Sequence, residues 1–581
     1  MPTTPGGSLS TATDINLLSS NSLFTDRVDR LQKQDFYRFS LSSSSSFNLH
    51  LDELSADADV QLVKDGNGNG IIDSGEVIKE SRLGGTSAET IALPNLDFGT
   101  YYIQVYAYGG AETNYKLTVS ATSNESIPIS TSGGSSRWEK GTLRADIFTY
   151  QRNSQITFIS GNGNVDFGSG KRDVLNLKDA GVFRNQVTFD WATASGGGVV
   201  ANPGNKSRLF DEIRLNGGDG RRILFEGIEK IEFAGGVTYD LTQQVPDNNI
   251  TPVVVPNDEA FNQQWNLHIT GVHNAWRFTT GSADKVLIGI EDSGLGTDSN
   301  GNIHPDLRRT FFNGNNYLDE SSSYSHGTLV QSTIAARGNN QQGIAGINWS
   351  SDSYMVDVLG GDNGDYDLAS ATQSIIDKAV SLGRRLVINF SLVGGSSKEL
   401  QNIIASNQDV LFVFAAGNDN KDSISSPGSF AQSYSNVISV GSSWGLTDWY
   451  RNAKNPGDRA YYENWWGSNY ASQADINAGL RPLTLMAPTE FIAGNAERNT
   501  SGTYNFNYDN KFNGTSASTP MVSGIASLVW SANPNLSASE IKAILAETAY
   551  DLGEQGYDQY YGYGFVNADA AVRTALALAR G

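Results

Sequence analysis

Two kinds of hydrophobic pattern divide the chain. Up to about residue 241, short stretches such as 35–41 and 101–106 alternate apolar and polar side chains between turn residues, which predicts β-strands with one buried face. From Asp258 onward, continuous apolar runs such as 286–290 and 386–390 alternate with helical stretches. This alternation predicts a parallel sheet with helices on both faces, whose functional sites lie at the carboxyl ends of its strands.

Composition and turn residues divide the chain into three expected domains. Residues 1–122 predict a β-sandwich, and a linker rich in serine and glycine separates it from a second β-rich module at residues 136–244. A segment rich in proline and valine, residues 245–256, leads to an α/β domain at residues 258–581. The expected fold class is therefore α/β, with a doubly wound parallel-sheet domain preceded by two all-β modules.

The composition narrows the classes of function. The 581 residues carry a formal net charge of −21, which disfavours nucleic-acid binding and suits cations or basic substrates, although charge also serves solubility. There is no cysteine, which excludes disulfides, thiolate metal sites and cysteine nucleophiles. The first 20 residues lack the basic start and apolar core of a signal peptide, and no apolar run is long enough for a membrane span. A cytoplasmic location and non-classical export both stay open.

Ser516 lies at a predicted junction between a loop and a helix. It follows a Gly-Thr turn within the run "NGTSASTP", and an apolar helical pattern begins directly after it. Free backbone N–H groups and the helix dipole favour negative charge at such a junction, which acyl transfer needs beside its nucleophile. The same pattern also suits an ordinary helix cap, so other residues must decide between the two interpretations.

Three further polar residues stand where predicted strands end or helices begin. Asp292 ends a buried strand before a Ser-Gly turn, His326 begins an apolar helix, and Asn418 follows a strand that ends in Ala-Gly. Singly, these are a turn former, a satisfied histidine and a loop amide. Together with Ser516 they place a carboxylate, an imidazole, an amide and a hydroxyl at one edge of the predicted sheet.

The order of these motifs resembles the subtilisin-like serine proteases. The resemblance covers residues 258–581 and rests on "EDSG", "SHGT", "INFSLVGG", "AAGN", "NGTSASTP" and "YGYGFVNADAA". It implies a serine endopeptidase acting on proteins or peptides, in which Ser516 attacks the scissile carbonyl, His326 transfers the proton and Asp292 orients the imidazole. Asn418 and the Ser516 N–H would hold the oxyanion. The whole architecture resembles the calcium-dependent subtilases of cyanobacteria.

Two positions depart from the family pattern. Glu291 precedes the aspartate where an apolar residue is usual, and Ala517 follows the serine where many bacterial members have methionine. Strand alternation directs the Glu291 side chain away from Asp292, so we expect the triad to survive.

Two alternatives come from other classes of protein. A calcium-binding adhesion or scaffold protein could carry an inactive protease domain, but every candidate catalytic position is intact. The carboxyl-type serine peptidases share the Gly-Thr-Ser turn, but they lack the His-Gly-Thr motif and place an aspartate at the oxyanion position. His326 and Asn418 exclude that group.

The two β-modules each resemble a known bacterial element. The stretches "DFYRFSL", "DADVQLVKDGNGNG" and "LDFGTYYIQVYAYGGAETNYKLTV" resemble the bacterial pre-peptidase C-terminal domain, which often accompanies secreted proteases. In the second module, residues 161–166 and 168–175 resemble degenerate copies of the glycine-aspartate repeat of calcium-binding β-rolls. Glycine turns in a β-sandwich explain those two copies equally well.

Two calcium sites are expected. Residues 65–76 fit the twelve-residue EF-hand loop between predicted strands. Its oxygen ligands would be Asp65, Asn67, Asn69, the Ile71 carbonyl, Asp73 and Glu76. The family resemblance implies a second site in the α/β domain, held by Asp258, Asp306 and Asn340 with carbonyls of the 338–344 loop.

The resemblance also implies where a substrate strand adds to the sheet. The edges would be Asn363-Gly364-Asp365 and Ser391-Leu392-Val393-Gly394, with Ser425 at the base of the S1 pocket. Acidic residues at 362, 365, 367, 419 and 422 favour basic side chains near the scissile bond, or are simply solvated loop acids.

The compact propeptide that is usual in subtilisins is not recognisable in the sequence. We therefore hypothesise that one of the β-modules, or the 245–257 linker, inhibits the site intramolecularly until calcium or cleavage releases it.

Overall fold

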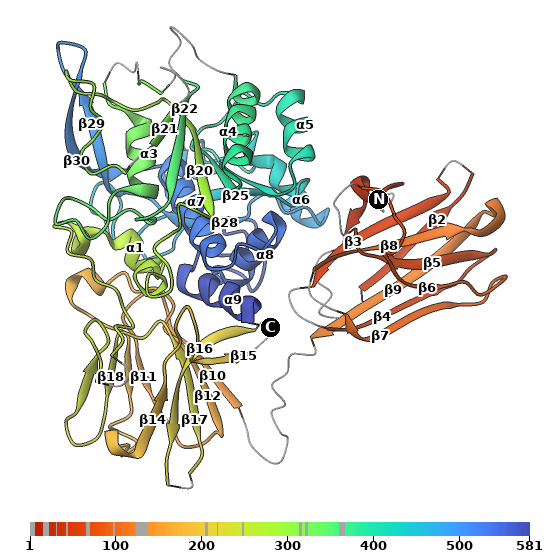
Figure 1. Cartoon of the computed structure of the whole chain (residues 1–581), viewed down its shortest axis with the longest axis horizontal. Helices are drawn as coiled ribbons and strands as arrows, with labels where there is room; N and C mark the ends of the chain where they lie inside the picture. The colour runs from red at the N-terminus through yellow and green to blue at the C-terminus, as the bar shows by residue number, and fades with distance from the viewer. Residues whose placement is uncertain are drawn as a thin grey trace. The chain divides into compact units, whose positions relative to one another are not determined.

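The computed structural model describes residues 6–15, 22–30, 32–41, 45–65, 70–96, 99–123, 136–203, 207–217, 219–246, 249–308, 310–312, 317–319, 323–359 and 367–580 (Figure 1). The chain forms two compact units, one of residues 1–132 with 201–207 and one of residues 133–200 with 208–581. None of the helices in the described ranges is long and apolar enough to cross a bilayer.

The N-terminal unit is a sandwich of two β-sheets. Alternating apolar side chains from both sheets form its core, in which Phe39 stacks on Phe47 at a centroid distance of 5.2 Å. The first sheet has the order β1 (Thr13–Asp14), β3 (Gln34–Leu41), β8 (Gly99–Ala107), β5 (Ala58–Val63), β6 (Val77–Ser81). The second has the order β2 (Ser22–Val28), β9 (Thr113–Ser123), β4 (Ser45–Asp52), β7 (Glu89–Leu96).

The second β-module is built mainly from two stacks of parallel strands. One stack contains β10 (Ser136–Lys140), β12 (Ile156–Ser160) and β17 (Arg222–Glu226). The other contains β11 (Ile147–Thr149), β13 (Val174–Asn176) and β18 (Lys230–Glu232). Antiparallel strands complete the sheets: β14 (Val187–Asp190), β16 (Arg208–Leu215), β19 (Thr238–Asp240). Because β10 to β13 alternate between the two stacks, this part of the module coils as repeat-built rolls do and differs from an antiparallel sandwich.

The acidic residues of the two glycine-aspartate copies are engaged inside the protein. Asp166 forms a bidentate pair with Arg144 at 2.9 and 3.0 Å. Asp173 is fully buried and accepts the N–H of Asp146 at 2.7 Å. Burial, followed by the charge of Glu229, raises the pKa of Asp173 well above its ordinary value. These contacts give both carboxylates partners within the protein.

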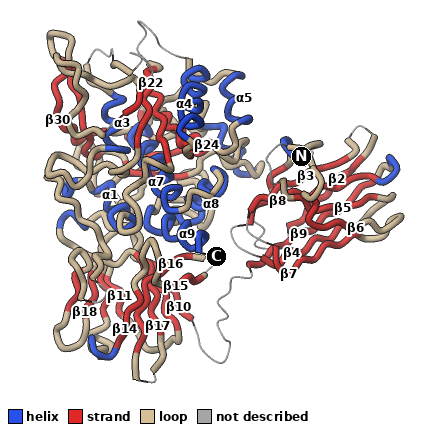
Figure 2. Tube along the Cα trace, in the orientation of Figure 1, coloured by secondary structure: helices blue, strands red, loops and turns tan. Residues whose placement is uncertain are grey.

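The α/β domain is organised around a seven-stranded parallel sheet, and Figure 2 shows helices grouped on it. Its order is β21 (Thr310–Phe312), β22 (Asp352–Asp357), β20 (Val286–Asp292), β23 (Arg385–Phe390), β24 (Val410–Ala415), β25 (Val437–Ser443), β28 (Leu485–Pro488). The predicted fold class is thereby confirmed.

Each face of the sheet is buried under its own set of helices. Leu386 and Ile388 share a core with α4 (Leu368–Leu382) and α5 (Lys398–Ser406). The alternate residue Val387 shares a core with the helices of the other face. Those helices are α3 (His326–Ala335), α7 (Thr515–Ala532), α8 (Ala538–Thr548) and α9 (Ala568–Arg580). Short helices and hairpins complete the domain. The helices are α1 (Trp265–Ile269), α2 (Val272–Ala275) and α6 (Gln473–Asn477). One hairpin pairs β26 (Tyr461–Tyr462) with β27 (Trp466–Gly467), and the other pairs β29 (Phe491–Arg498) with β30 (Tyr504–Phe512).

The second β-module and the α/β domain share one hydrophobic core. The Phe167 ring lies 4.9 Å from the ring of His268 on α1 and 4.5 Å from that of His273 on α2. At Gly163, a Cβ atom would come within 1.7 Å of the Ile269 carbonyl oxygen, so this close approach requires glycine. The module therefore packs as an integral part of its unit.

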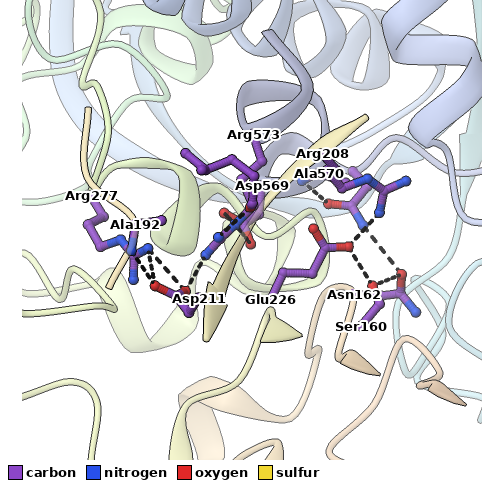
Figure 3. A network of polar contacts seen from close by, with 12 residues as sticks. Ser160, Asn162, Ala192, Arg208, Asp211, Glu226, Arg277, Asp569, Ala570 and Arg573 are labelled. Atoms are coloured by element: carbon purple, nitrogen blue, oxygen red, sulfur yellow. Dashed lines mark hydrogen bonds and ion pairs between the residues drawn. The ribbon is translucent and has the colours of Figure 1, made fainter. Parts of the chain in front are cut away.

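A buried ion network crosses the same interface (Figure 3). Asp211 of β16 pairs with Arg277 at 2.8 Å and with Arg573 of α9 at 3.0 Å, and Arg573 also pairs with Asp569 at 2.9 Å. Burial alone would raise the pKa of Asp211, but the two guanidinium groups hold it below its ordinary value. Nearby, Glu226 pairs with Arg208. The buried carboxylates of Asp211, Asp569 and Glu226 thus each have a guanidinium partner.

The segment rich in proline and valine is packed against the folded unit. Val245 and Val253 are 2% and 1% exposed. The Val253 N–H donates to Leu241 O at 3.0 Å, and the Val254 N–H donates to His273 O at 3.0 Å. These contacts place the segment beside α2 and the last strand of the second module.

Candidate active site

Asp292 and His326 meet at the carboxyl edge of the parallel sheet. Asp292 is the last residue of β20, and His326 is the first residue of α3 after the Ser325 N-cap. The Nδ1 atom of His326 lies 2.6 Å from Oδ1 of Asp292. Burial would lower the pKa of His326, but the charge and hydrogen bond of Asp292, with the charge of Asp319, raise it above its ordinary value. The pair can therefore stabilise an imidazolium.

A second layer of contacts fixes this pair, and sequence reasoning missed it. The Ser293 hydroxyl donates to Oδ2 of Asp319 at 2.6 Å and accepts the N–H of Gly327 at 3.1 Å. The Phe512 ring stands edge-on to the His326 imidazole at 5.8 Å. Only the tertiary fold brings β30 and α3 together, so no local sequence signal marks Phe512.

Ser516 is the second residue of α7 and points toward the end of β23. Its hydroxyl donates to the backbone oxygen of Ser391 at 3.0 Å, and the Ser391 hydroxyl donates back to Ser516 O at 2.9 Å. This reciprocal contact holds the first turn of α7 against the sheet. A transfer of the Ser516 proton to His326 would require the hydroxyl to turn away from Ser391. Hydrogen bonds between catalytic groups commonly tighten only when substrate binds.

Asn418 is held with its amide nitrogen available. Its side-chain oxygen accepts the backbone N–H of Thr515 at 2.8 Å and the Thr515 hydroxyl at 3.0 Å. A backbone N–H can only donate, so the oxygen must face Thr515 and the NH₂ group must face away. A Cβ on Gly514 would lie 3.1 Å from that nitrogen, and Gly514 has a positive φ of 79°. The geometry suits a donor for an oxyanion beside Ser516.

Glu291 lies on the opposite face of β20 from the candidate triad. Its Oε1 atom accepts the hydroxyl of Thr372 on α4 at 2.7 Å. The side chain is fully buried, and this burial raises its pKa well above the ordinary value. The side chain points away from Asp292, as strand alternation requires.

Similarity to known proteins agrees with this geometry. Residues 283–564 match the subtilase family, and residues 33–107 match the bacterial pre-peptidase C-terminal domain. Subtilisin BL of Lederbergia lenta is 34% identical over 308 residues, which cover 52% of this chain and 94% of that protein. The chain belongs to the subtilase family. It is a serine protease of the subtilisin type.

Two further comparisons cover a similar share of this chain. The thermostable alkaline protease of Halalkalibacterium halodurans is 32% identical over 309 residues, covering 52% of this chain and 70% of that protein. A solved structure of proteases from Pseudoalteromonas arctica aligns with 55% of this chain and 100% of its own, at 26% identity and a TM-score of 0.43.

The expected substrate edges are described only in part. Asn363, Gly364 and Asp365 lie outside the described residues. On the other edge, Ser391 and Leu392 are buried, Val393 is 50% exposed, and the Gly394 N–H donates to Ser426 O at 2.8 Å. The edge is therefore accessible from Val393 onward.

The expected S1 residue and two of the nearby acids, Asp419 and Asp367, have defined partners in the subtilase. The Ser425 hydroxyl accepts a hydrogen bond from Asn469 Nδ2 at 3.1 Å. Asp419 is exposed and lies 3.7 Å from Lys421. Asp367 accepts the N–H of Ser370 at 2.9 Å as the N-cap of α4, so that carboxylate serves a helix end.

Asp258, Asp306 and Asn340 come together around the 338–344 loop. Asp258 accepts the Asn339 N–H at 2.7 Å, and Asp306 accepts the Asn340 amide at 2.8 Å. Asp258 and Asp306 are 5% and 1% exposed, and burial raises the pKa of both. Within the described part of the chain neither forms an ion pair. Two buried carboxylates and an amide grouped around one loop suit a hard cation with oxygen ligands.

Tyr508 adds a contact that the sequence did not indicate. Its hydroxyl, on β30, donates to Oδ2 of Asp306 at 3.2 Å. The β29–β30 hairpin thus contacts both the His326 ring, through Phe512, and the candidate cation site, through Tyr508.

The loop at 65–76 joins β5 to β6, so its flanks are strands. Lys64 N donates to Glu76 O at 2.9 Å and closes the loop. Asp65 accepts the N–H of Gly70 at 2.9 Å, and Glu76 accepts that of Asp73 at 2.9 Å. Ile71 is 63% exposed. Asn67 and Asn69 lie outside the described residues.

Proposed function

We propose that this subtilase is a calcium-dependent serine endopeptidase that cleaves peptide bonds through Asp292, His326 and Ser516. The 2.6 Å contact between His326 Nδ1 and Asp292 Oδ1 carries the proposal, because it fixes the tautomer that leaves Nε2 able to accept a proton. Ser516, at the start of α7, supplies the hydroxyl.

The proposed reaction follows from these positions. Ser516 Oγ leaves its contact with Ser391 O and attacks the scissile carbonyl, while His326 takes the hydroxyl proton. The Asn418 NH₂ group and the Ser516 N–H stabilise the negative oxygen of the tetrahedral intermediate. His326 then donates the proton to the leaving amine, and water repeats the sequence to release the acyl group.

Calcium has a structural part in this proposal. Asp258, Asp306 and Asn340 would hold one ion, and residues 65, 67, 69, 71, 73 and 76 would hold another in the N-terminal unit. A bound ion supplies positive charge to the buried carboxylates and stabilises the folded state by mass action. In the α/β domain it would fix the 338–344 loop, which contacts Asp306 through the Ile344 N–H at 3.1 Å.

We also propose that basic side chains are preferred near the scissile bond and that the region N-terminal to the α/β domain inhibits the site. Exposed Asp419 follows Asn418 directly, although Lys421 offsets part of its charge. The restraint would come from residues that precede the α/β domain, either one of the two β-modules or the 245–257 linker. Equal activity with and without these residues would contradict inhibition.

The test is a cleavage profile of a peptide library with the full chain, with calcium and with chelator, using Ser516→Ala as control. The proposal expects cleavage that requires Ser516, weakens in chelator and favours lysine or arginine. Aromatic preference at P1 would overturn the basic-residue part, and cleavage by the Ser516→Ala variant would overturn the whole proposal.

A further inference from the structure

The β29–β30 hairpin lies beside α3 and holds the start of this helix, which carries His326 (Figure 1). The backbone N–H of Ser325, the N-cap of α3, donates to Ala496 O of β29 at 2.8 Å. Further along the helix, the Ser332 hydroxyl accepts the Gly494 N–H of β29 at 2.8 Å. The hairpin therefore fixes the junction of loop and helix at which His326 stands.

Tyr504 of β30 extends these contacts to a buried carboxylate. Its hydroxyl donates to the backbone oxygen and to Oδ1 of Asp319, both at 3.1 Å. The ring packs so closely on Gly296 that a Cβ there would come within 2.8 Å of it. Tyr504 and Asp319 are 4% and 7% exposed. Burial, followed by the charge of Asp319, raises the pKa of Tyr504, so its hydroxyl stays a neutral donor into the alkaline range.

Asp319 is linked in turn to the pair formed by Asp292 and His326. Its Oδ2 atom accepts the Ser293 hydroxyl at 2.6 Å, and that hydroxyl accepts the N–H of Gly327, the residue after His326, at 3.1 Å. The Ser293 N–H donates to Oδ1 of Asp292 at 2.8 Å. One serine therefore connects the Asp319 carboxylate to both members of the pair.

Asp319 is the second negative charge that acts on the imidazole. Burial lowers the pKa of His326, whereas the charge and hydrogen bond of Asp292 and then the charge of Asp319 raise it. The helix α7, which packs against α3, carries no charged side chain. The other charged side chains on the neighbouring strands β20 and β22 are Glu291, Asp352 and Asp357. Those on the hairpin strands are Glu497, Arg498, Asp509 and Lys511.

We infer that Tyr504 and Asp319 are positioning residues: Tyr504 holds the ionised Asp319 carboxylate against Ser293, and this second charge makes His326 a stronger base. The inference deepens the proposed endopeptidase function and rests on it for its consequence in catalysis. A stronger base takes the Ser516 proton more readily, but it also stays protonated up to a higher pH. A tyrosine on the hairpin thereby sets the acid limit of the pH range in which the enzyme cleaves.

Diethyl pyrocarbonate reports the proton on His326 without any need for proteolysis, because it reacts with the neutral imidazole. The full chain is labelled from acid to alkaline pH in a Ser516→Ala background, which prevents self-digestion. Peptide mass spectrometry then gives the rate at His326, whose side chain is 25% exposed. His50 of the N-terminal unit, with a side chain that is 47% exposed, is the internal reference. Thermal melting checks that each variant is folded.

In Asp319→Asn, which keeps an acceptor for Ser293, we expect the midpoint of His326 labelling to fall by about 0.5–1 pH unit. Tyr504→Phe keeps the ring but removes the donor that favours the ionised carboxylate. Its midpoint should fall by a smaller amount, and adding Tyr504→Phe to Asp319→Asn should cause no further shift. In the chains that retain Ser516, the acid limb of kcat/KM for a p-nitroanilide should move in parallel.

Two control variants make matched changes elsewhere in the α/β domain. Asp377→Asn removes an exposed carboxylate of α4, and Tyr354→Phe removes a hydroxyl that bonds to Ser374. Both should keep the parent midpoint, and His50 should keep its own midpoint in every variant.

An unchanged His326 midpoint in folded Asp319→Asn overturns the inference. An unchanged midpoint in Tyr504→Phe, or a further shift in the double variant, overturns the part given to Tyr504. If the midpoints shift as expected but the folded parent cleaves no peptide, the proposed function fails while the effect of Asp319 on His326 stands.

Discussion

The side-chain oxygen of Asn418 accepts the backbone N–H of Thr515, the residue directly before Ser516, at 2.8 Å. The loop after β24 and the start of α7 are thereby held to each other. The contact occupies the side-chain oxygen of Asn418 and leaves its NH₂ group to donate to the substrate. The orientation of the Asn418 side chain is therefore fixed before substrate binds.

Replacing Asn418 should therefore affect the rate and leave binding largely unchanged. We expect Asn418→Ala to lower kcat by about 10²–10³ with little change in KM, because the lost donor acts on the tetrahedral oxygen. Steady-state kinetics on a p-nitroanilide measure this, with melting as a check on folding. Retention of most of the parent kcat in a folded variant would rule out the oxyanion role.

The pH dependence of activity should report the His326–Asp292 pair. His326 must be neutral to accept the Ser516 proton, and its pKa is raised, so the acid limb of kcat/KM should lie above the ordinary imidazole value of about 6.5. Asp292→Asn should move the limb to lower pH and reduce kcat by about 10⁴. Profiles from acid to alkaline pH test this, and a parent limb below about 6.5 would contradict it.

Calcium removal should destabilise the unit that contains Asp306. Chelator should lower its melting temperature, since saturation at about 100 times Kd contributes about 2.7 kcal/mol. In the Asp306→Asn variant, this unit should melt at the same temperature with and without calcium. The control variant Asp377→Asn, which changes an exposed carboxylate on α4, should respond to calcium like the parent. Identical melting of the parent in calcium and in excess chelator would refute the site.

The Asp211 network should hold the second module and the α/β domain together. Asp211→Asn leaves the buried Arg277 without its carboxylate partner and removes one of the two carboxylates that pair with Arg573, so we expect a loss of about 3–5 kcal/mol in the free energy of unfolding. Lys178→Gln removes an exposed pair of the same module and should cost less than about 1 kcal/mol. Denaturant unfolding compares the two, and equal small effects would show that the network contributes little.

Glu291 should make stability depend on pH in a defined direction. Its folded pKa is raised, so the folded state binds a proton more tightly than the unfolded state does. Stability is then highest below the unfolded pKa and falls as pH rises through the folded pKa. Glu291→Gln keeps an acceptor for Thr372 and should flatten this fall. Melting temperatures across that pH range test it, and parallel curves for parent and variant would contradict it.

The sequence predicted the elements that local pattern controls. Asp292 closes β20 because a continuous apolar run ends there, and His326 opens α3 after a serine cap. Ser516 lies in the first turn of α7, which follows a glycine turn. Buried strands and helix starts depend on neighbouring residues in the sequence. The positions of the candidate triad could therefore be predicted without the structure.

Contacts between distant segments could not be predicted in this way. Arg573 meets Asp211 across 362 positions, and Phe512, on the β29–β30 hairpin, contacts the His326 ring. The glycine-aspartate copies also left open whether the second module is a roll or a sandwich. The glycine-aspartate pattern predicts turns. It does not predict which strands pair in parallel, because that pairing depends on contacts between distant segments.

The most direct test of the account is labelling by a fluorophosphonate, which reacts with a serine only when base and oxyanion donors activate it. In calcium, the account predicts that the folded full chain takes up one label, mapped by peptide mass spectrometry to Ser516. Ser516→Ala should take up none, and His326→Ala should react far more slowly. A folded parent that stays unlabelled, or a label on another serine, would contradict the claim that Ser516 is the nucleophile.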